Sequence, residues 1–101
     1  MWIFTPEFAV SIVQHNDDHS KLIVRSRQSG DIERFLGGEV SAESTPTFDY
    51  PYRLVAPRDL VVAAMARSAT DLDYGNVKGA VHERERAKVM YAVYEAYRSS
   101  V

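Results

Sequence analysis

The stretch that decides the fold spans residues 8–27 and reads FAVSIVQHNDDHSKLIVRSR. Residues 8–13 are apolar and rich in β-branched side chains, which is typical of a largely buried strand. Residues 16–20 are a polar cluster that favours a turn. Residues 21–27 then alternate, because successive side chains of a strand point to opposite faces. The segment therefore predicts a β-hairpin with one apolar face.

The next third of the chain predicts a short helix and a second pair of strands. Ser29 is a candidate helix cap, and the apolar residues that follow it share one helix face until Gly37-Gly38 ends the pattern. Residues 39–44 are a weaker strand prediction, and residues 50–55 a stronger one. In that last strand Tyr52 and Leu54 lie on one face, and Arg53 and Val55 on the other.

The last 45 residues predict two helices. Pro57 suits the first position of a helix, and an apolar stripe follows it: Leu60, Val61, Ala64, Met65, Ala69 and Leu72. Asn76 is a candidate cap for a long final helix over residues 77–97. The first half of that helix is charged and its second half is apolar and aromatic. We therefore expect most of its packing to come from the second half.

This order of elements predicts an α+β fold in a single domain, residues 1–101. Hairpins separated from helices indicate a two-layer sandwich, with helices on one face of a mostly antiparallel four-stranded sheet in ββαββαα order. The face beneath the helices should carry an apolar set in register: Val10, Ile12, Leu22, Val24 and Leu54.

Composition narrows the class of function. The chain has 101 residues, 46% of them hydrophobic and 26% charged, with a net charge of −2. A slightly acidic chain does not attract nucleic acid or anionic membranes in general. There is no cysteine, so disulfides and thiolate chemistry are excluded. Residues 1–6 lack the basic start of a signal peptide, and no apolar run reaches membrane-spanning length. We expect a cytoplasmic protein.

Three polar clusters are candidates for chemistry. His15, Asp17, Asp18 and His19 offer metal ligands, but their order is ordinary for an exposed turn. Asp71 and Asp73 suit acid–base work or a cation, although capping of the helix junction explains them more simply. His82 with Glu83 or Glu85 could act as a general base, but no nucleophile accompanies them. The three-residue spacing of Glu83 and Arg86 suggests an ordinary ion pair on the helix surface. We expect no metal, no cofactor and no enzymatic activity.

A basic strand face is the first candidate interaction surface. Lys21, Arg25 and Arg27 share one side of their strand, and Arg53 joins them from the second hairpin. With Tyr50 or Tyr52 nearby, such a face resembles a sheet that stacks bases and contacts phosphates. The simpler interpretation is a solvated outer face, on which arginine stems cover apolar area.

Tyrosines mark two further candidate surfaces. Tyr91, Tyr94 and Tyr97 recur at three-residue spacing along the final helix, where they either pack inward or bind a partner. In the connector before that helix, Tyr74 and Lys78 are candidate partner-binding residues. The alternative places Tyr74 over the helix pair and Lys78 in solvent.

Several segments together resemble a family of small uncharacterised proteins of actinobacteria and their phages. The resembling segments are the opening hydrophobic stretch and residues 13–18, 22–27, 49–53 and 71–78, which together span most of the chain. Family members more often have proline at the position of Gly75 and phenylalanine at that of Val77. The resemblance implies no particular activity.

These observations favour a small, non-enzymatic interaction or regulatory protein of phage-related origin. We expect an unidentified protein partner, and self-association as a homodimer is the simplest form of it. The candidate interaction residues are Arg25, Arg27, Arg53, Tyr52, Tyr74 and Lys78. The alternative is a nucleic-acid-binding module that uses the basic sheet face.

Overall fold

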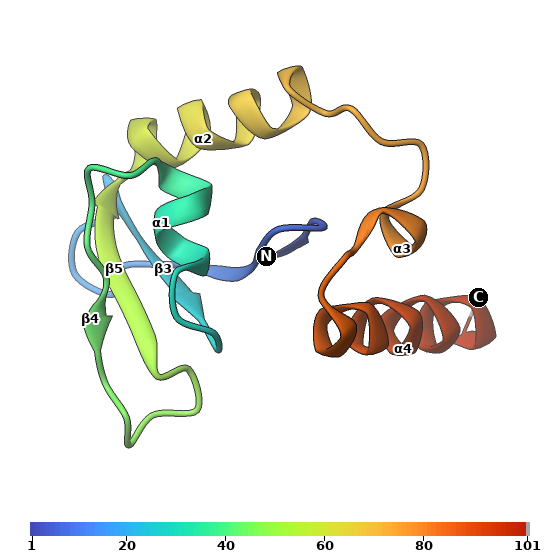
Figure 1. Ribbon diagram of the computed structural model, residues 1–101. Coiled ribbons are helices and arrows are strands. Elements are labelled where there is room, and N and C mark those ends of the chain that lie inside the picture. Colours follow the sequence, from blue (N-terminus) through green and yellow to red (C-terminus); the bar gives the residue numbers. More distant parts are fainter. Residues whose placement is uncertain (101) are drawn as a thin grey trace.

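Five antiparallel strands form one sheet, in the order β1-β2-β3-β5-β4 (Figure 1). The computed structural model describes residues 1–100. The strands are β1 (Trp2–Phe4), β2 (Ala9–Gln14), β3 (Lys21–Ser26), β4 (Glu43–Ser44) and β5 (Tyr52–Pro57). The helices are α1 (Asp31–Leu36), α2 (Arg58–Thr70), α3 (Val77–Ala80) and α4 (Arg84–Ser100). The predicted α+β class with an antiparallel sheet is confirmed.

The predicted number of strands is wrong by one. Residues 2–4 pair with β2, with Ile3 opposite Val10, so the opening apolar residues form an edge strand. Thr5 makes the turn between the two strands, since its hydroxyl oxygen accepts hydrogen bonds from the amides of Glu7 and Phe8. At the opposite edge, β4 keeps only two of the six predicted residues.

The register confirms the predicted alternation of faces. Ile12 lies opposite Val24, and Val24 lies opposite Leu54. One residue along, a second row crosses the sheet on the other face and contains Trp2, Ser11, Arg25, Arg53 and Glu43. Side chains in such rows are direct cross-strand neighbours.

Helices α1 and α2 cover the first of these faces. Val10, Ile12 and Val24 pack with Ile32 of α1 and Val61 of α2 in one buried cluster. The predicted apolar face of α1 is confirmed, but its cap is not. Gly30, in a left-handed conformation with φ 89°, takes the N-cap position in place of Ser29. Gly37, with φ 107°, ends the helix as predicted.

The predicted stripe of α2 is wrong in part. Val61 and Ala64 are buried, whereas Met65 and Leu72 are 36% and 53% exposed. The sheet below is short, so the outer turns of α2 run past it, and residues 71–76 arch away from the sheet toward α3 (Figure 1).

The predicted continuous helix over residues 77–97 is two helices. Val81 is extended, with φ −83° and ψ 121°, and ends α3 after four residues. Helix α4 starts at Arg84 and projects away from the sheet, so that its C-terminal end lies far from the core (Figure 1). Within residues 1–100, no helix combines the length and apolarity needed to cross a membrane.

Candidate functional site

A buried carboxylate lies where the sheet, α1 and α4 meet. Asp31, the first residue of α1, is 1% exposed. One of its carboxylate oxygens accepts a hydrogen bond from the amide of Ala9 at 3.0 Å and another from Arg86 Nη1 at 3.1 Å. The other oxygen accepts from Arg34 at 2.6 Å and from Arg86 Nη2 at 2.8 Å. Asp31, in α1, therefore links strand β2 to helix α4.

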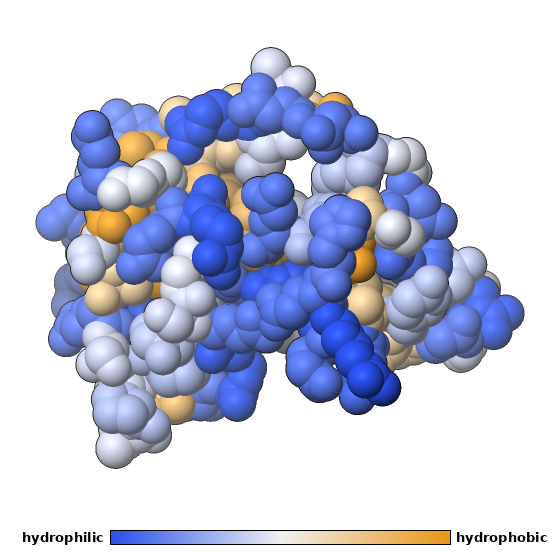
Figure 2. Space-filling view, viewed as in Figure 1, coloured by the Kyte–Doolittle hydropathy of each residue, from blue (hydrophilic) through white to orange (hydrophobic). Residues whose placement is uncertain are grey.

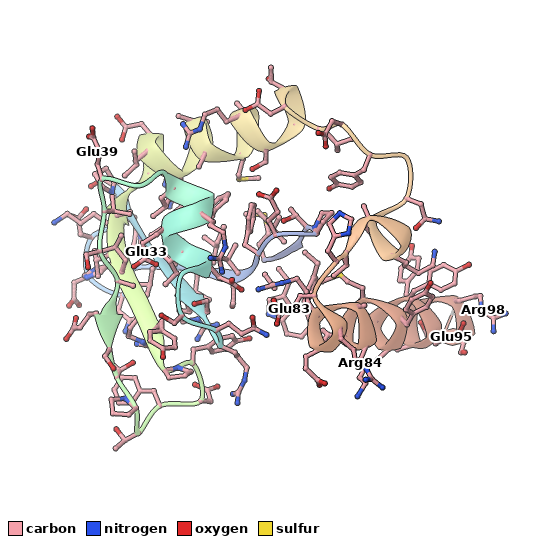
Figure 3. The ribbon with its side chains drawn as sticks, viewed as in Figure 1. Glu33, Glu39, Glu83, Arg84, Glu95 and Arg98 are labelled. Atoms are coloured by element: carbon pink, nitrogen blue, oxygen red, sulfur yellow. The ribbon has the colours of Figure 1, made fainter. Side chains whose placement is uncertain are left out.

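Its main partner, Arg86, is equally buried, with 3% of its surface exposed. Arg86 also donates to the side-chain oxygen of Gln28 at 2.8 Å and lies 3.7 Å from a carboxylate oxygen of Glu83. The predicted pairing of Glu83 with Arg86 is therefore present, but it is not an ordinary surface pair, because Arg86 is buried. Figure 3 shows Glu83 at the end of α4 that meets the body. A buried, bidentate ion pair anchors α4.

The apolar stripe of α4 continues beyond this anchor. Met90, one turn after Arg86, is buried at 3% exposure, but Val93 and Tyr97 on the same line are 41% and 67% exposed. Side chains three and four residues apart share a helix face. The prediction that the second half of this helix supplies most of its packing is wrong in part, because Met90 is the one buried residue of that half within residues 1–100 and Arg86 of the charged half is buried as well. Figure 3 shows Glu95 and Arg98 at the outer end, away from the body.

The three tyrosines of α4 are all exposed, and one of them has a cationic neighbour. Tyr91, Tyr94 and Tyr97 are 52%, 42% and 67% exposed. The ammonium of Lys78 lies 3.9 Å from the centroid of the Tyr94 ring, a distance typical of a cation–π contact. The structure thus places Lys78 against α4 and leaves the three tyrosines exposed to solvent.

A cavity of about 460 Å³ opens between α4 and the N-terminal strands. Trp2 and Phe4 form one wall, and Val89 and Met90 form the other. Arg27, Gln28 and Tyr50 also line it, as do both partners of the buried ion pair. The cavity and the α4 stripe meet at Val89 and Met90.

The predicted basic face exists, but its arginines have neighbours within the chain. Arg25 and Arg53 lie directly opposite each other on β3 and β5. The guanidinium of Arg25 stacks 4.4 Å from the centroid of Tyr50, and that of Arg53 stacks 4.6 Å from the centroid of Phe48. Both rings belong to the loop before β5, which therefore lies over this part of the sheet.

Arg27 and Tyr52 differ from the expected arrangement. Arg27 lies one residue beyond β3 and donates to the backbone carbonyl of Asp49. Tyr52 pairs with Ser26 and packs against the core, on the face opposite Arg25 and Arg53. Of the two tyrosines considered for the basic surface, Tyr50 lies there, and the choice of Tyr52 as an interaction residue of that surface is wrong because Tyr52 packs against the core.

A second cavity, of about 850 Å³, lies beneath the connector from α2 to α3. Figure 2 shows this part of the surface as a hollow under a hydrophilic arch. Asp71, Asp73, His82 and Glu83 all line it, so the structure brings together two polar clusters that are separate in the sequence. Among the described residues, these side chains make no group of three or more suited to holding a metal.

The first hairpin turn is closed by its own side chains. The amides of Asp17 and Asp18 donate to His15 Nδ1 at 3.2 and 3.0 Å. Asp18 in turn accepts from the hydroxyl of Ser20 at 2.6 Å and from its amide at 3.0 Å. These hydrogen bonds, led by that of the hydroxyl, lower the pKa of the Asp18 carboxyl from its usual value. The turn interpretation is confirmed.

The connector contains the predicted cap. The side-chain oxygen of Asn76 accepts from the amide of Lys78 at 3.0 Å, which confirms the capping role. The same oxygen accepts from the Lys78 ammonium at 3.3 Å. Tyr74 is half-buried and lines the second cavity.

Comparisons of the chain with protein-family models, curated proteins and solved structures gave no match. The resemblance noted from the sequence therefore stays a prediction. The central missed feature is the ion pair between Asp31 and Arg86, whose partners lie 55 residues apart. Its one sequence signal is an arginine in line with Met90, Val93 and Tyr97.

Proposed function

We propose that this protein is a non-enzymatic interaction module that binds a protein partner through the exposed stripe of α4. One observation carries the proposal: the apolar stripe that is buried at Met90 continues into solvent as Val93 and Tyr97. Of the twelve exposed large hydrophobic residues among residues 1–100, five lie on α4. Clustered exposed apolar residues mark interaction sites, whereas scattered ones need no explanation.

The spacing of the stripe indicates what it binds. Arg86, Met90, Val93 and Tyr97 follow one another at intervals of four, three and four residues, which is the seam of a heptad pattern. The residues beyond Met90 extend about 15 Å at 1.5 Å per residue. The matching partner is the apolar face of an amphipathic helix.

The anchor of α4 supports this role. In proteins most of the stability of a helix comes from tertiary packing, and a binding surface is most effective when it is ordered beforehand. The buried pair of Asp31 and Arg86 holds the first turn of α4, so the stripe projects from a fixed base. This arrangement suits a cytoplasmic adaptor and requires no chemistry at the site.

Affinity capture with matched variants tests the proposal. The bait proteins are the parent, Val93→Glu on the stripe, and Ser99→Glu near the end of the same helix. We expect the parent and Ser99→Glu to recover the same discrete protein at low and moderate salt, and Val93→Glu to lose it. Equal recovery by all three baits would show that the stripe is not the docking surface.

A nucleic-acid module is the second candidate, because Arg25 and Arg53 are direct cross-strand neighbours with no ion-pair partner within residues 1–100. Like charges at such positions repel each other, and an anion would relieve the repulsion. Filter binding of single-stranded DNA and RNA over a salt series tests it. Binding that weakens with salt and is lost in Arg25→Glu would favour this candidate.

A further inference from the structure

The cavity between α4 and the N-terminal strands differs from the stripe beyond it, since residues of strands, loops and α4 line it together and polar side chains are among them. Its volume of about 460 Å³ lies within the range of roughly 300–1,000 Å³ that small-molecule sites occupy. Trp2, Phe4, Val89 and Met90 provide walls for an apolar body. Predominantly apolar walls with a few polar groups are the usual composition of a ligand site.

The charge of the residues that line the cavity indicates which polar group the ligand carries beside its apolar body. Two arginines and one aspartate line the cavity, which leaves one net positive charge. Arg86 and Asp31 neutralise each other at 2.8 Å, so the unbalanced charge is that of Arg27. Within residues 1–100, Arg27 has no ion-pair partner, and its one hydrogen bond goes to the carbonyl of Asp49.

The neighbouring polar groups also offer donors. Gln28, which lines the cavity, accepts a hydrogen bond from Arg86 through its side-chain oxygen, and its amide NH₂ is a donor. The hydroxyl of Ser11 accepts from Arg25 at 2.7 Å and keeps its own proton to donate. The polar residues of the lining therefore match a ligand acceptor that carries negative charge.

We propose that this cavity binds a small amphipathic carboxylate, with its apolar body between Trp2 and Val89 and its carboxylate at Arg27. A charge-assisted hydrogen bond from an arginine to a carboxylate is stronger than a neutral one and gives the ligand its orientation. Such a site is distinct from the exposed part of the stripe, because Val93 and Tyr97 do not line the cavity, whereas the buried stripe residues Arg86 and Met90 do.

Trp2 is the one tryptophan of the chain and lies in the cavity wall, so its fluorescence reports on this site. The probes are decanoate, decanol and decyltrimethylammonium, which share an apolar chain and differ in the charge of the head group. We expect decanoate to shift the Trp2 emission to shorter wavelength with one-to-one stoichiometry by calorimetry. It should bind about tenfold more tightly than decanol, as one hydrogen bond to a charged group allows.

Two variants and a control assign the residues. Arg27→Gln should lower the affinity for decanoate to that for decanol and leave decanol unchanged. Val89→Glu should abolish decanoate binding by placing a carboxylate in the wall, whereas Ser99→Glu should bind decanoate like the parent. Melting curves for each variant exclude unfolding as the cause of any loss.

Three outcomes would overturn the proposal: no saturable shift with decanoate, equal affinity for decanoate and decanol in the parent, or unchanged decanoate affinity in Arg27→Gln. The result is separable from the proposed docking function. Val93→Glu should lose the protein partner and still bind decanoate, so failure of one test leaves the other standing.

Discussion

Replacing Arg86 by methionine should release α4 from the body while leaving the sheet intact. Methionine keeps a long, flexible side chain that packs against apolar neighbours, but it cannot pair with Asp31. The main core cluster of the sheet, α1 and α2 contains no residue of α4. The loss should therefore appear first as undocking of α4 and only later as global unfolding.

The size of the effect follows from the environment of Asp31. Removing one partner of a buried ion pair costs about 3–5 kcal/mol, because the other charge is left buried without compensation. Asp31 keeps two hydrogen bonds, from the amide of Ala9 and from the half-exposed Arg34. We therefore expect the lower end of the range, about 3 kcal/mol, which corresponds to roughly a 150-fold change in the docking equilibrium.

Amide hydrogen exchange measures this equilibrium directly. Undocking removes the tertiary packing that supplies most of the stability of a helix, so the amides around Met90 should exchange roughly 150-fold faster in Arg86→Met, in line with the docking free energy. The amide of Val24, in the central strand β3, should keep its protection. Arg84→Met is the matched control, since Arg84 is exposed on the same helix and forms no ion pair within residues 1–100. If the Met90 region exchanges at the same rate in Arg86→Met as in Arg84→Met, the ion pair does not anchor α4.

Three further predictions concern the core, the connector and the first turn. Ile32→Ala should lower the free energy of unfolding by about 2–5 kcal/mol in urea titrations, because Ile32 is fully buried; a loss below 1 kcal/mol would contradict the packing. Asn76→Ala should cost about 1 kcal/mol of local stability through the lost cap, visible as faster amide exchange at Lys78, and exchange at the parent rate would argue against capping. Ser20→Ala should raise the pKa of Asp18 in an NMR titration, since the Ser20 hydroxyl is the main group that lowers it. Because that pKa is lowered by folding, Asp18 stabilises the turn above its unfolded-state pKa and loses this effect as pH falls through the folded-state value; an unchanged pKa in the variant would refute the assignment.

Local patterns were sufficient for the centre of the fold. The alternation over residues 21–27 placed Leu22 and Val24 on the core face, and the register with β2 and β5 confirms it. The apolar spacing of Ile32, Phe35 and Leu36 likewise gave the buried face of α1. These elements could be predicted because their periodicity is set by residues close in sequence.

The edges of the fold and the anchor of α4 depend on distant residues. Strand β1 has only three residues, too few for alternation to be recognised, and its pairing with β2 defines it. The burial of Arg86 depends on Asp31, at the start of a helix from another part of the chain. A charged residue at the start of a charged helix segment favours a surface interpretation, and only tertiary packing reverses it.

The candidate interaction surfaces could be predicted only in part, because local periodicity places some of their residues and tertiary packing places the others. Arg25 and Arg53 share a face because strands alternate, and that expectation holds. Proximity in sequence left both Tyr50 and Tyr52 as candidates beside these arginines, although the alternation of Tyr52 with Arg53 already places Tyr52 on the other face. The exposure of the α4 stripe could not be predicted, because an apolar helix face normally indicates burial. The sequence does not show how far the packed body of the protein extends along this helix.

The most direct test of the central claim is photo-crosslinking from α4 in living cells. A photoreactive phenylalanine analogue replaces Val93 on the stripe in one variant and Lys88, which is exposed on the opposite side of the helix, in another. The docking account predicts one discrete crosslinked protein from position 93, lost when Tyr97→Glu is added, and none from position 88. Equal crosslinking from both positions, or none from position 93, would contradict it.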